Sequence, residues 1–379
     1  MDSFKAGKYL QRDHYRSFEP NAINRQWQIR DMKVMSLLSR ADRQLGRLDM
    51  YSEYVPNIDL FISAHVAKEA TKSSKIEGTQ TRMEEAFMDE EHISPEKRDD
   101  WEEVQNYIKA MNRAITELEH LPVSTRLIRE THRVLMQGVR GERKQPGEFR
   151  SSQNWIGGAT LDDALFVPPL HQNIPDLMSD LEQFIHNQEI DIPDLIKIAI
   201  VHYQFETIHP FLDGNGRVGR LLITLYLVSR NILKKPMLYL SDFLERNRTT
   251  YFNNLMRVRE RDDMGQWIKF FLAGVIETAE SGIATLDGIL QLKDEVDRKL
   301  QTLGSRAGNA QKVVHRLFQR PVVTADQVGE AADVSKPTAY TLITSLEDLG
   351  ILDEITGNER NRVYLFREYM ELFTSKRDS

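Results

Sequence analysis

The sequence predicts a mainly α-helical protein, and three observations support this fold class. Apolar residues recur with the helical period along most of the 379 residues. Strand-like alternation is confined to two short regions, and no repeat of fixed period interrupts the chain. Apolar residues make up 40% and charged residues 28% of the chain, as in a globular protein with a sizeable core. The length predicts two to three domains.

The composition excludes several kinds of site. The chain has no cysteine, which rules out disulfides, thiol catalysis and Cys-ligated metal centres. A net charge of −7 argues against a generally basic nucleic-acid binder and against a polybasic membrane anchor. The first twenty residues contain no apolar signal-peptide core, and no apolar run reaches the roughly 18 residues that span a bilayer. We therefore expect a cytoplasmic protein that makes no membrane contact.

The N-terminal region is expected to be helical. Residues 21–50 have the pattern of a charged amphipathic helix, and residues 57–77 have the pattern of a second helix. Gly78 suits a left-handed cap at the end of that second helix. The Thr81-x-x-Glu84 spacing predicts a capping box at the start of the next helix.

The middle of the chain changes character twice. Residues 122–138 predict one more helix, and the glycine- and proline-rich stretch 146–170 then predicts a hairpin or an ordered loop. Pro193 opens a helix that must stop near His209, because Pro210 disfavours helix in the residue before it.

The most informative segment is His209-Pro-Phe-Leu-Asp-Gly-Asn-Gly-Arg-Val-Gly-Arg220. Gly214 and Gly216 allow the backbone to curve, and a helix is predicted to start at about Arg217. The backbone N–H groups at such a helix start form a nest suited to phosphates. Arg217 and Arg220 oppose the helix dipole there, so the pattern predicts that an anion binds at this end.

Asp213 and His209 are the candidate reactive groups of this segment. Asp213 is a hard oxygen ligand beside the nest and suits a Mg²⁺ ion that bridges phosphates. His209 has an ordinary pKa of about 6.5 and could accept a proton from an incoming hydroxyl. A purely structural histidine is the ordinary alternative. The segment also matches G-x-G-x-x-G, but the preceding segment is helical, which excludes a dinucleotide-binding βαβ unit.

The twelve-residue segment resembles the signature of the Fic family, HPFxxGNGRxxR, at every specified position. The stretch 146–170, with PGEFR, IGG and VPPL, is similar to the flap region of that family. The likeness covers about residues 60–260. It implies a Fic-type helical catalytic core at 121–280, with the motif at 209–220 and a small β-hairpin flap at about 153–170.

Three further parts complete the expected domain organisation. Residues 1–120 form an N-terminal helical region, and residues 281–304 form a helical linker. Residues 305–379 predict helix, helix, helix and hairpin in that order, which is typical of a winged helix-turn-helix domain. This last segment has 10 Lys and Arg against 11 Asp and Glu, so DNA and protein both remain open as its partner.

The resemblance implies transfer of AMP from ATP to a Ser, Thr or Tyr hydroxyl of a protein, with release of pyrophosphate. It assigns His209 as the general base and Asp213 as the Mg²⁺ ligand. It places Arg217 along the phosphate chain and Arg220 nearest the γ-phosphate. The other nucleotide-binding positions that it implies are Glu77, Gly214, Asn215, Gly216, Val218, Gly219 and Tyr251, with the glycines and Asn215 at the α- and β-phosphates and Tyr251 near adenine.

A second motif, Ser73-Ser-Lys-Ile-Glu77-Gly78, resembles the Fic inhibitory signature S/T-x-x-x-E-G/N. Ser73 and Glu77 are four residues apart and therefore share one helix face. The ordinary alternative is that Glu77 is a surface residue without an inhibitory role. The resemblance implies an inhibitory helix at about 62–78, in which Glu77 pairs with Arg220 and holds ATP in an unproductive pose.

Other functions remain open at this point. One alternative is a DNA-binding transcriptional regulator whose Fic domain senses a nucleotide, although a sensor needs no general base such as His209. Another is removal of AMP by the same site, and a third is transfer from a different donor or from flipped ATP. Self-modification, DNA binding through the C-terminal domain and a homodimer are further expectations, besides the protein target that carries the hydroxyl.

Overall fold

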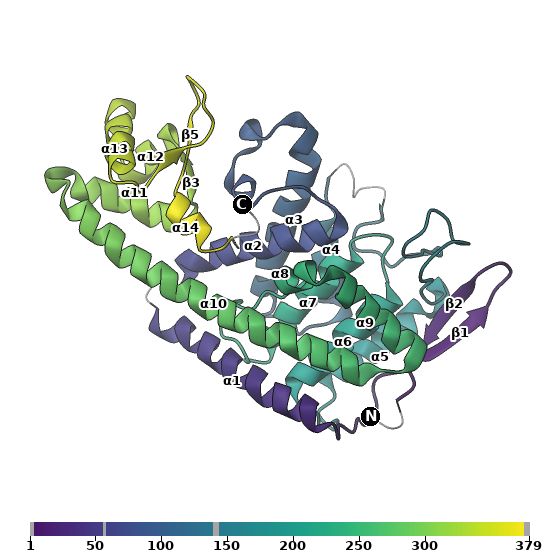
Figure 1. Ribbon diagram of the computed structural model, residues 1–379. Coiled ribbons are helices and arrows are strands. Elements are labelled where there is room, and N and C mark those ends of the chain that lie inside the picture. The colour runs from purple at the N-terminus through teal and green to yellow at the C-terminus, as the bar shows by residue number, and fades with distance from the viewer. Residues whose placement is uncertain (1–3, 56–57, 139–143, 375–379) are drawn as a thin grey trace.

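A computed structural model describes residues 4–55, 58–138 and 144–374 of the chain (Figure 1). Helices dominate the described residues, as the sequence predicts. The helices are α1 Met32–Tyr54, α2 Asp59–Glu77, α3 Arg98–Glu117, α4 Thr125–Leu135, α5 Ile174–His186, α6 Asp194–Ile208, α7 Asn215–Ser229, α8 Ser241–Arg246, α9 Arg248–Arg261, α10 Met264–Gln301, α11 Ala307–Gln319, α12 Ala325–Ala332, α13 Lys336–Asp348 and α14 Arg367–Glu371. The strands are β1 Gly7–Gln11, β2 Arg16–Pro20, β3 Val322–Thr324, β4 Asp353–Glu354 and β5 Val363–Leu365.

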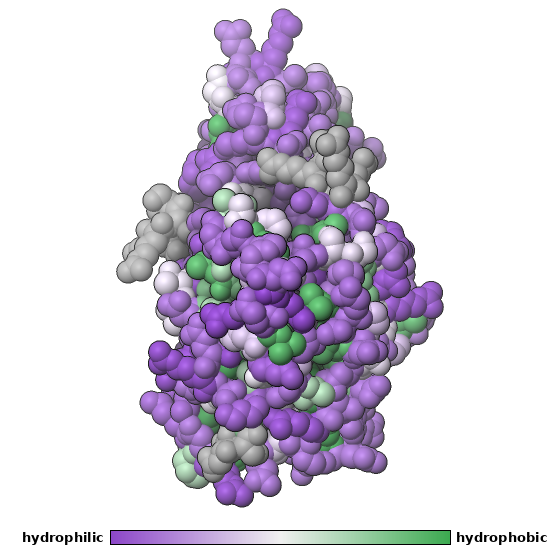
Figure 2. Space-filling model, turned by 90° about the vertical axis from the view of Figure 1, so that its right-hand side faces the viewer, coloured by the Kyte–Doolittle hydropathy of each residue, from purple (hydrophilic) through white to green (hydrophobic). Residues whose placement is uncertain are grey.

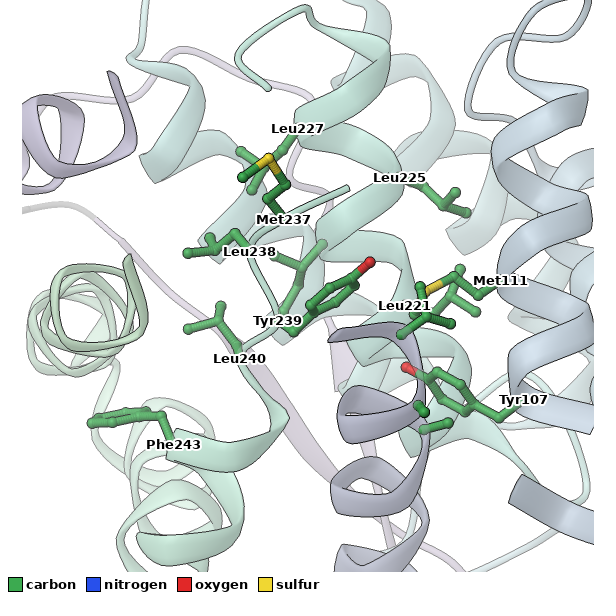
Figure 3. Packing of buried hydrophobic residues seen from close by; sticks show 14 of the residues in the cluster. Tyr107, Met111, Leu221, Leu225, Leu227, Met237, Leu238, Tyr239, Leu240 and Phe243 are labelled. Atoms are coloured by element: carbon green, nitrogen blue, oxygen red, sulfur yellow. The ribbon is translucent and has the colours of Figure 1, made fainter. Parts of the chain in front are cut away.

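The core is built around α6 and α7. Every residue of α6 from Leu195 to Ile208 is buried, and α7 is buried from Arg217 to Leu227. Helices α2, α3, α4 and α6 all contact α7. Figure 3 shows Tyr107 and Met111 of α3 beside Leu221 of α7. The helix that follows the Fic-like motif is therefore held from several sides at once.

The longest helix, α10, has 38 residues and lies along α1 (Figure 1). It runs without a break to Gln301, so the segment expected as a separate linker at 281–304 is mostly the second half of this helix. Among the described residues, no helix combines the length and the apolar character needed to cross a bilayer. The face turned to the viewer in Figure 2 is mostly hydrophilic, with apolar residues in small scattered groups.

The C-terminal unit (residues 305–374) contains α11 to α14 and a three-stranded antiparallel sheet in the order β3-β5-β4. It packs against α2 through two aromatic pairs. The ring centroids of Phe61 and Phe318 are 5.6 Å apart, and those of His65 and Phe373 are 4.9 Å apart. Strand β3 and helix α14 were not expected from the sequence.

The predicted helix at 21–50 begins too early. The helix starts at Met32, where the Asp31 carboxylate caps the N–H groups of Lys33 and Val34. Residues 21–31 before it form neither helix nor strand. The N–H of Ile23 in this segment donates to the carboxylate of Asp180 at 2.7 Å. This tertiary partner is invisible to helical periodicity.

The antiparallel hairpin β1–β2 was not expected from the sequence. Its inward residue Phe18 is fully buried and lies beside Phe166, with ring centroids 6.0 Å apart. The hairpin therefore packs on the glycine- and proline-rich loop, and this contact stabilises strands too short to stand alone.

The predicted capping box at Thr81 and Glu84 is wrong. Glu85 accepts from Arg82 N at 2.7 Å and pairs with Lys97 at 2.8 Å, and short 3-10 turns fill the segment until α3 begins at Arg98. The carboxylate of Glu85 thus accepts from the N–H of Arg82, a backbone donor that a capping box would have bonded to Thr81 or Glu84.

Other local expectations hold. The φ angle of Gly78 is +113°, and Ser124 caps α4 by accepting from Leu127 N at 3.3 Å. The expected flap hairpin is present as one antiparallel bridge between Ile156 and Phe166. The remainder of that stretch is a loop with two prolines, Pro168 and Pro169, at its end.

Candidate active site

The candidate site lies where α6 ends and α7 begins. His209 has left-handed backbone angles (φ 50°, ψ 61°), and Gly214 has φ 74°. These two positions turn the chain back so that α7 starts at Asn215. The N–H groups in the first turn of α7 have no carbonyl ahead of them in the helix, so they are available to an anion. The turn that the glycines predict is present here, and anion binding by these N–H groups stays a prediction.

Two asparagine side chains hold this loop in place. From the sequence, Asn215 was expected among the nucleotide-binding residues, and Asn154 was given no role. The Asn215 amide bonds both backbone groups of Phe211, accepting from its N–H at 2.8 Å and donating to its carbonyl at 2.9 Å. Asn154 also donates to the Phe211 carbonyl at 2.9 Å. The side chain of Asn215 is thus used to close the loop, which leaves its backbone N–H for a ligand.

His132 of α4 supports the loop from the other side. Its ring stacks on Phe211 with centroids 3.7 Å apart. Gly147 N donates to Nδ1 at 2.8 Å, so the ring proton is on Nε2, which donates to the Asp213 carbonyl at 3.0 Å. Burial lowers the pKa of His132 to about 4, and the ring stays neutral in this role. No short motif marks this residue, which lies far from the loop in sequence.

Arg150 holds the turn at His209. It is 2% exposed, and its guanidinium donates to four backbone carbonyls, those of Ser152, Pro169, Ile208 and His209. Burial lowers its pKa to about 10. The sequence reading included this arginine in PGEFR but gave it no function. Its contacts hold the end of α6 against the flap loop.

His209 is suited to act as a base. Burial and, to a smaller extent, the charges of Arg259 and Arg150 lower its pKa to about 4, with Glu77 opposing them. The imidazole is therefore neutral at neutral pH. Its Nδ1 is buried and has no hydrogen-bond partner within the described residues, which leaves Nε2 as the nitrogen available to accept a proton.

Arg220 is bound to both residues of the predicted inhibitory motif. Its Nε donates to Ser73 Oγ at 2.8 Å, and its Nη2 donates to the Ser73 carbonyl at 2.9 Å and to Glu77 Oε1 at 2.7 Å. Burial by itself raises the pKa of Glu77, but the charge and hydrogen bond of Arg220, together with the charges of Arg217 and His209, hold it below the ordinary value. Burial likewise lowers the pKa of Arg220, but the charge and hydrogen bond of Glu77, together with the acidic groups of Tyr251 and Glu206, raise it above the ordinary value.

Gly216 is required by this close approach. A Cβ atom at that position would lie 2.2 Å from Glu77 Oε1 and 2.8 Å from Arg220 Nη1. The carboxylate of Glu77 therefore lies directly against the first turn of α7, in the region of the nest.

Arg217 and Asp213 form the other wall of the site. Arg217 Nη1 lies 3.0 Å from Glu103 Oε2, and Nη2 lies 3.6 Å from Asp213 Oδ1. The Asp213 side chain is 48% exposed and also accepts from Gly214 N at 2.6 Å. The described ranges contain no group of three or more His, Cys, Asp or Glu side chains that could hold a metal. A single carboxylate beside a nest fits Mg²⁺ only if substrate phosphates complete the shell, as is usual for this ion.

Val218, Gly219 and Tyr251 lie behind the start of α7. His202 donates from Nδ1 to the Gly219 carbonyl at 2.9 Å and accepts from Tyr251 at Nε2, also at 2.9 Å. The Tyr251 side chain is 1% exposed. This network supports the helix from its buried side, and a contact of Tyr251 with adenine stays a prediction.

Two profiles of one protein family match the chain. The Fic/DOC family N-terminal profile matches residues 35–116, and the Fic/DOC family profile matches residues 122–227. The first range contains Ser73 and Glu77, and the second contains the whole 209–220 motif.

Curated relatives are similar over shorter segments. A probable protein adenylyltransferase of Aquifex aeolicus (strain VF5) is 34% identical over 116 residues, which is 30% of this chain and 32% of that protein. Protein adenylyltransferase Fic of Drosophila erecta is 31% identical over 112 residues, which is 29% of this chain and 21% of that protein. The similarity thus spans about a third or less of the length of these relatives.

Solved structures share the fold over most of the chain. The crystal structure of a Fic family protein from Desulfovibrio desulfuricans G20 matches with a TM-score of 0.60 at 19% identity, covering 90% of this chain and 98% of that chain. Fic-1 of C. elegans matches with a TM-score of 0.51 at 18% identity, covering 69% of this chain and 74% of that chain.

Proposed function

The chain belongs to the Fic/DOC family, and from this premise we propose that it is a protein adenylyltransferase that transfers AMP from ATP to a hydroxyl side chain of a protein. One observation carries the proposal. A neutral, partly accessible imidazole, His209, lies at one end of the loop whose other end is the nest at the start of α7, where two guanidinium groups are buried. This is the arrangement that transfer of a nucleotidyl group requires, because positioning and charge stabilisation supply most of the catalysis.

In the proposed reaction the target hydroxyl oxygen attacks the α-phosphorus of ATP. The bond from that oxygen to phosphorus forms, and the bond to the oxygen bridging the α- and β-phosphates breaks. Nε2 of His209 takes the hydroxyl proton, and pyrophosphate leaves with the electron pair of the broken bond. The first-turn N–H groups of α7 and the guanidinium of Arg217 stabilise the charge on the phosphates.

Asp213 would hold Mg²⁺ together with the phosphates, and the ion would neutralise part of their charge. The half-exposed carboxylate beside the nest supports this assignment. The three residues on either side of Asp213 in the chain contain no further carboxylate. The substrate itself would therefore supply the remaining Mg²⁺ ligands.

We propose that Glu77 inhibits this reaction. Its carboxylate occupies the guanidinium of Arg220, which would otherwise bind the γ-phosphate, and it lies against Gly216 of the nest. A triphosphate that enters meets a negative charge where its last phosphate should bind. It would then bind in a pose with the α-phosphorus misaligned for attack.

The test is label transfer from ATP carrying a radioactive α-phosphate to protein in a cell lysate. Glu77→Gly should raise the transfer above wild type, and His209→Ala should abolish it, alone and combined with Glu77→Gly. Mass spectrometry of the labelled protein should then find an AMP adduct on a Ser, Thr or Tyr.

Matched controls are Glu91→Gly and His120→Ala, which change exposed residues of the same kinds away from the site. Both should behave as wild type. Equal labelling by wild type and Glu77→Gly would refute the inhibition, and labelling that survives His209→Ala would refute the assigned base.

The flap loop is the proposed docking site for the target. Its bridge between Ile156 and Phe166 leaves Trp155 and Leu165 41% and 77% exposed. An extended segment of a partner can pair with such a backbone edge. Substitution of Leu165 by Asp should raise the KM for the target and leave self-modification unchanged.

We further propose that residues 305–374 form a winged helix. Helix α11, strand β3, helices α12 and α13 and strands β4 and β5 follow one another along the chain in the order of that fold, and the strands pair as β3-β5-β4. Exposed Tyr340 on α13 supports a role in binding. A salt-dependent shift of duplex DNA by the full chain, lost with Tyr340→Ala, would support DNA as the partner. If the full chain does not shift duplex DNA at low salt, DNA is refuted as the partner of this unit and a protein is the partner that we then expect.

A further inference from the structure

A chain of buried polar groups lies behind the inhibitory contact, where α3 and α8 both pack on α2. Glu69, Ser73 and Glu77 follow one another at intervals of four residues and therefore share one face of α2. Glu69 lies two turns before Glu77 and is 2% exposed. A buried carboxyl group costs folding free energy unless hydrogen bonds compensate it.

Glu69 accepts hydrogen bonds from both neighbouring helices. Tyr107 Oη of α3 donates to Oε1 at 3.0 Å, Ser241 Oγ of α8 donates to Oε1 at 2.5 Å, and Ser241 N donates to Oε2 at 3.1 Å. Tyr107 and Ser241 are fully buried. Each of these three bonds uses the carboxyl group of Glu69 as the acceptor.

Tyr107 joins Glu69 to Ser73. Figure 3 shows the Tyr107 hydroxyl directed from α3 toward α2. Burial and the charge of Glu69 raise the pKa of Tyr107, whereas a hydrogen bond with Ser73 opposes that rise, as a donor to the phenolic oxygen does. Tyr107 thus donates to Glu69 and accepts from Ser73.

The chain of bonds runs on to Arg220. The Ser73 hydroxyl uses its proton toward Tyr107, and its oxygen accepts from Arg220 Nε at 2.8 Å. The donors therefore all point the same way, from Arg220 through Ser73 and Tyr107 to Glu69. Hydrogen bonds in such a chain strengthen one another, because each polarises the next.

The direction of this chain fixes the orientation of the Ser73 hydroxyl. A serine inside a helix commonly turns its hydroxyl to the carbonyl four residues before it. Here the phenolic oxygen of Tyr107 is a competing acceptor, and it is free to accept because its own proton is bonded to Glu69. The lone pairs of the Ser73 oxygen are then presented to Arg220.

The surroundings of Glu69 make the Tyr107 bond measurable. Burial raises the pKa of Glu69 to about 7, while the bonds from Ser241 and Tyr107 and the charge of Arg220 oppose that rise. Loss of the Tyr107 donor should therefore raise the pKa of Glu69 further.

Other titratable groups lie around Glu69. They are the Tyr239 hydroxyl and the side chains of His65, Lys68, Asp242 and Arg246, which line one small cavity with Glu69. Lys68 and Asp242 pair with each other at 3.7 Å. The α10 residues in the wall of this cavity do not titrate, namely Thr278, Ser281, Gly282 and Thr285.

We propose that Tyr107 and Glu69 are positioning residues of the inhibitory contact, which orient the Ser73 hydroxyl so that its oxygen accepts from Arg220. The consequence for AMP transfer rests on the proposed function, whereas the orientation of Ser73 and the order of the last turn of α2 do not.

The test is a double-mutant cycle of Tyr107→Phe and Ser73→Ala in the full chain, read by label transfer from ATP. Tyr107→Phe removes one hydroxyl and keeps the ring that lies beside Leu221. It should raise transfer about two- to ten-fold, which is the size expected for one lost hydrogen bond. In the Ser73→Ala background it should raise transfer no further, because the oxygen through which it acts is gone.

Tyr369→Phe is the matched control. Tyr369 is also fully buried, and its hydroxyl donates to the Phe318 carbonyl at 3.0 Å in the C-terminal unit. This variant loses a buried bond of the same kind as Tyr107→Phe. It should lower stability and leave transfer at the wild-type level.

Two further readouts do not involve transfer. In Tyr107→Phe, amide exchange of residues 77–79 should be faster than in wild type, and in Tyr369→Phe it should not. The stability that Glu69 contributes is present at low pH and is lost as pH rises through 7, and a higher pKa deepens this loss. The denaturant midpoint of Tyr107→Phe should therefore lie further below wild type at pH 8 than at pH 5, whereas Tyr369→Phe should show the same difference at both.

Wild-type transfer in Tyr107→Phe, when Ser73→Ala raises transfer, would overturn the proposal. So would effects of the two substitutions that multiply in the double variant, or unchanged amide exchange in Tyr107→Phe. If neither Ser73→Ala nor Glu77→Gly raises transfer, the proposed inhibition fails instead. Faster exchange of residues 77–79 in Tyr107→Phe would still support the positioning role in that case.

Discussion

Arg220 of α7 donates to Glu77 of α2 at 2.7 Å, across 143 positions of sequence. The guanidinium is 1% exposed at its side chain, whereas the carboxylate is 39% exposed. The contact therefore joins a fixed cation of the core to an acid on the last turn of a helix, which can move more easily. This difference in exposure suits the proposed inhibition, in which the Glu77–Arg220 contact would have to break before the site becomes active.

Ser73→Ala should release part of the proposed inhibition. It removes the bond from Arg220 Nε to Ser73 Oγ at 2.8 Å and leaves the bonds to the Ser73 carbonyl and to Glu77. Label transfer should rise above wild type and remain below Glu77→Gly. The matched variant Ser63→Ala, on the same helix away from Arg220, should not change it. Transfer in Ser73→Ala at the wild-type level would show that Glu77 holds Arg220 alone.

Arg150→Lys should lower both stability and transfer. A lysine ammonium cannot reach the four carbonyls that the guanidinium joins. Buried carbonyls left without donors cost about 1–3 kcal/mol each, so we expect a loss of a few kcal/mol in the free energy of unfolding. Chemical denaturation measures this loss. Because the turn at His209 loosens, kcat should fall about ten-fold or more. Arg126→Lys is the control for a general effect of the substitution.

The pH dependence of transfer tests the state of His209. Burial lowers its pKa to about 4, so the base is already neutral above pH 5. In the Glu77→Gly background, kcat/KM should be flat from about pH 6 to 8 and should decline only toward pH 4. A midpoint near the ordinary value of about 6.5 would contradict the buried environment of the ring.

Stability should fall as the solution is acidified through the same range. The folded protein holds His132, His202 and His209 with pKa values of about 4, each lowered mainly by burial. Between pH 6.5 and 4 the unfolded chain binds more protons at these rings than the folded chain does, so unfolding is favoured as pH falls. Denaturant midpoints at pH 7 and pH 5 measure the loss. His202→Gln should reduce the difference, and His120→Gln should not.

Glu206→Gln should have the opposite pH signature. Burial raises the pKa of Glu206 to about 7, so the folded carboxyl keeps its proton where the unfolded one has lost it. Its contribution to stability is present at low pH and is lost as pH rises through 7. The difference in thermal midpoint between the glutamine variant and wild type should therefore be more favourable to the variant at pH 8 than at pH 5. The exposed Glu260→Gln serves as control, and an equal shift at both pH values would refute the raised pKa.

Local patterns predicted much of the framework correctly. Residues close together in sequence are enough to predict three features. These are the apolar run at the centre of α7, the cap at Gly78 and the end of α6 before Pro210. Such features depend on periodicity and on the backbone preferences of glycine and proline, which act over a few residues.

The supports of the candidate site could not be found in this way. His132, Arg150 and Asn154 reach the motif loop from 57 to 81 positions away, and each contacts a backbone carbonyl rather than a residue type that a motif could specify. The late start of α1 and the hairpin β1–β2 likewise depend on partners that are distant in sequence, Asp180 and Phe166.

The sequence by itself determined the class of the fold and the residues of the motif, because helical period, turn glycines and charged groups at a helix start are local properties. Only the tertiary structure decided that the two motifs touch and that the imidazole is held neutral. Burial and contact between distant segments set the protonation and pairing of a side chain, and neither can be read from the order of residues along one segment.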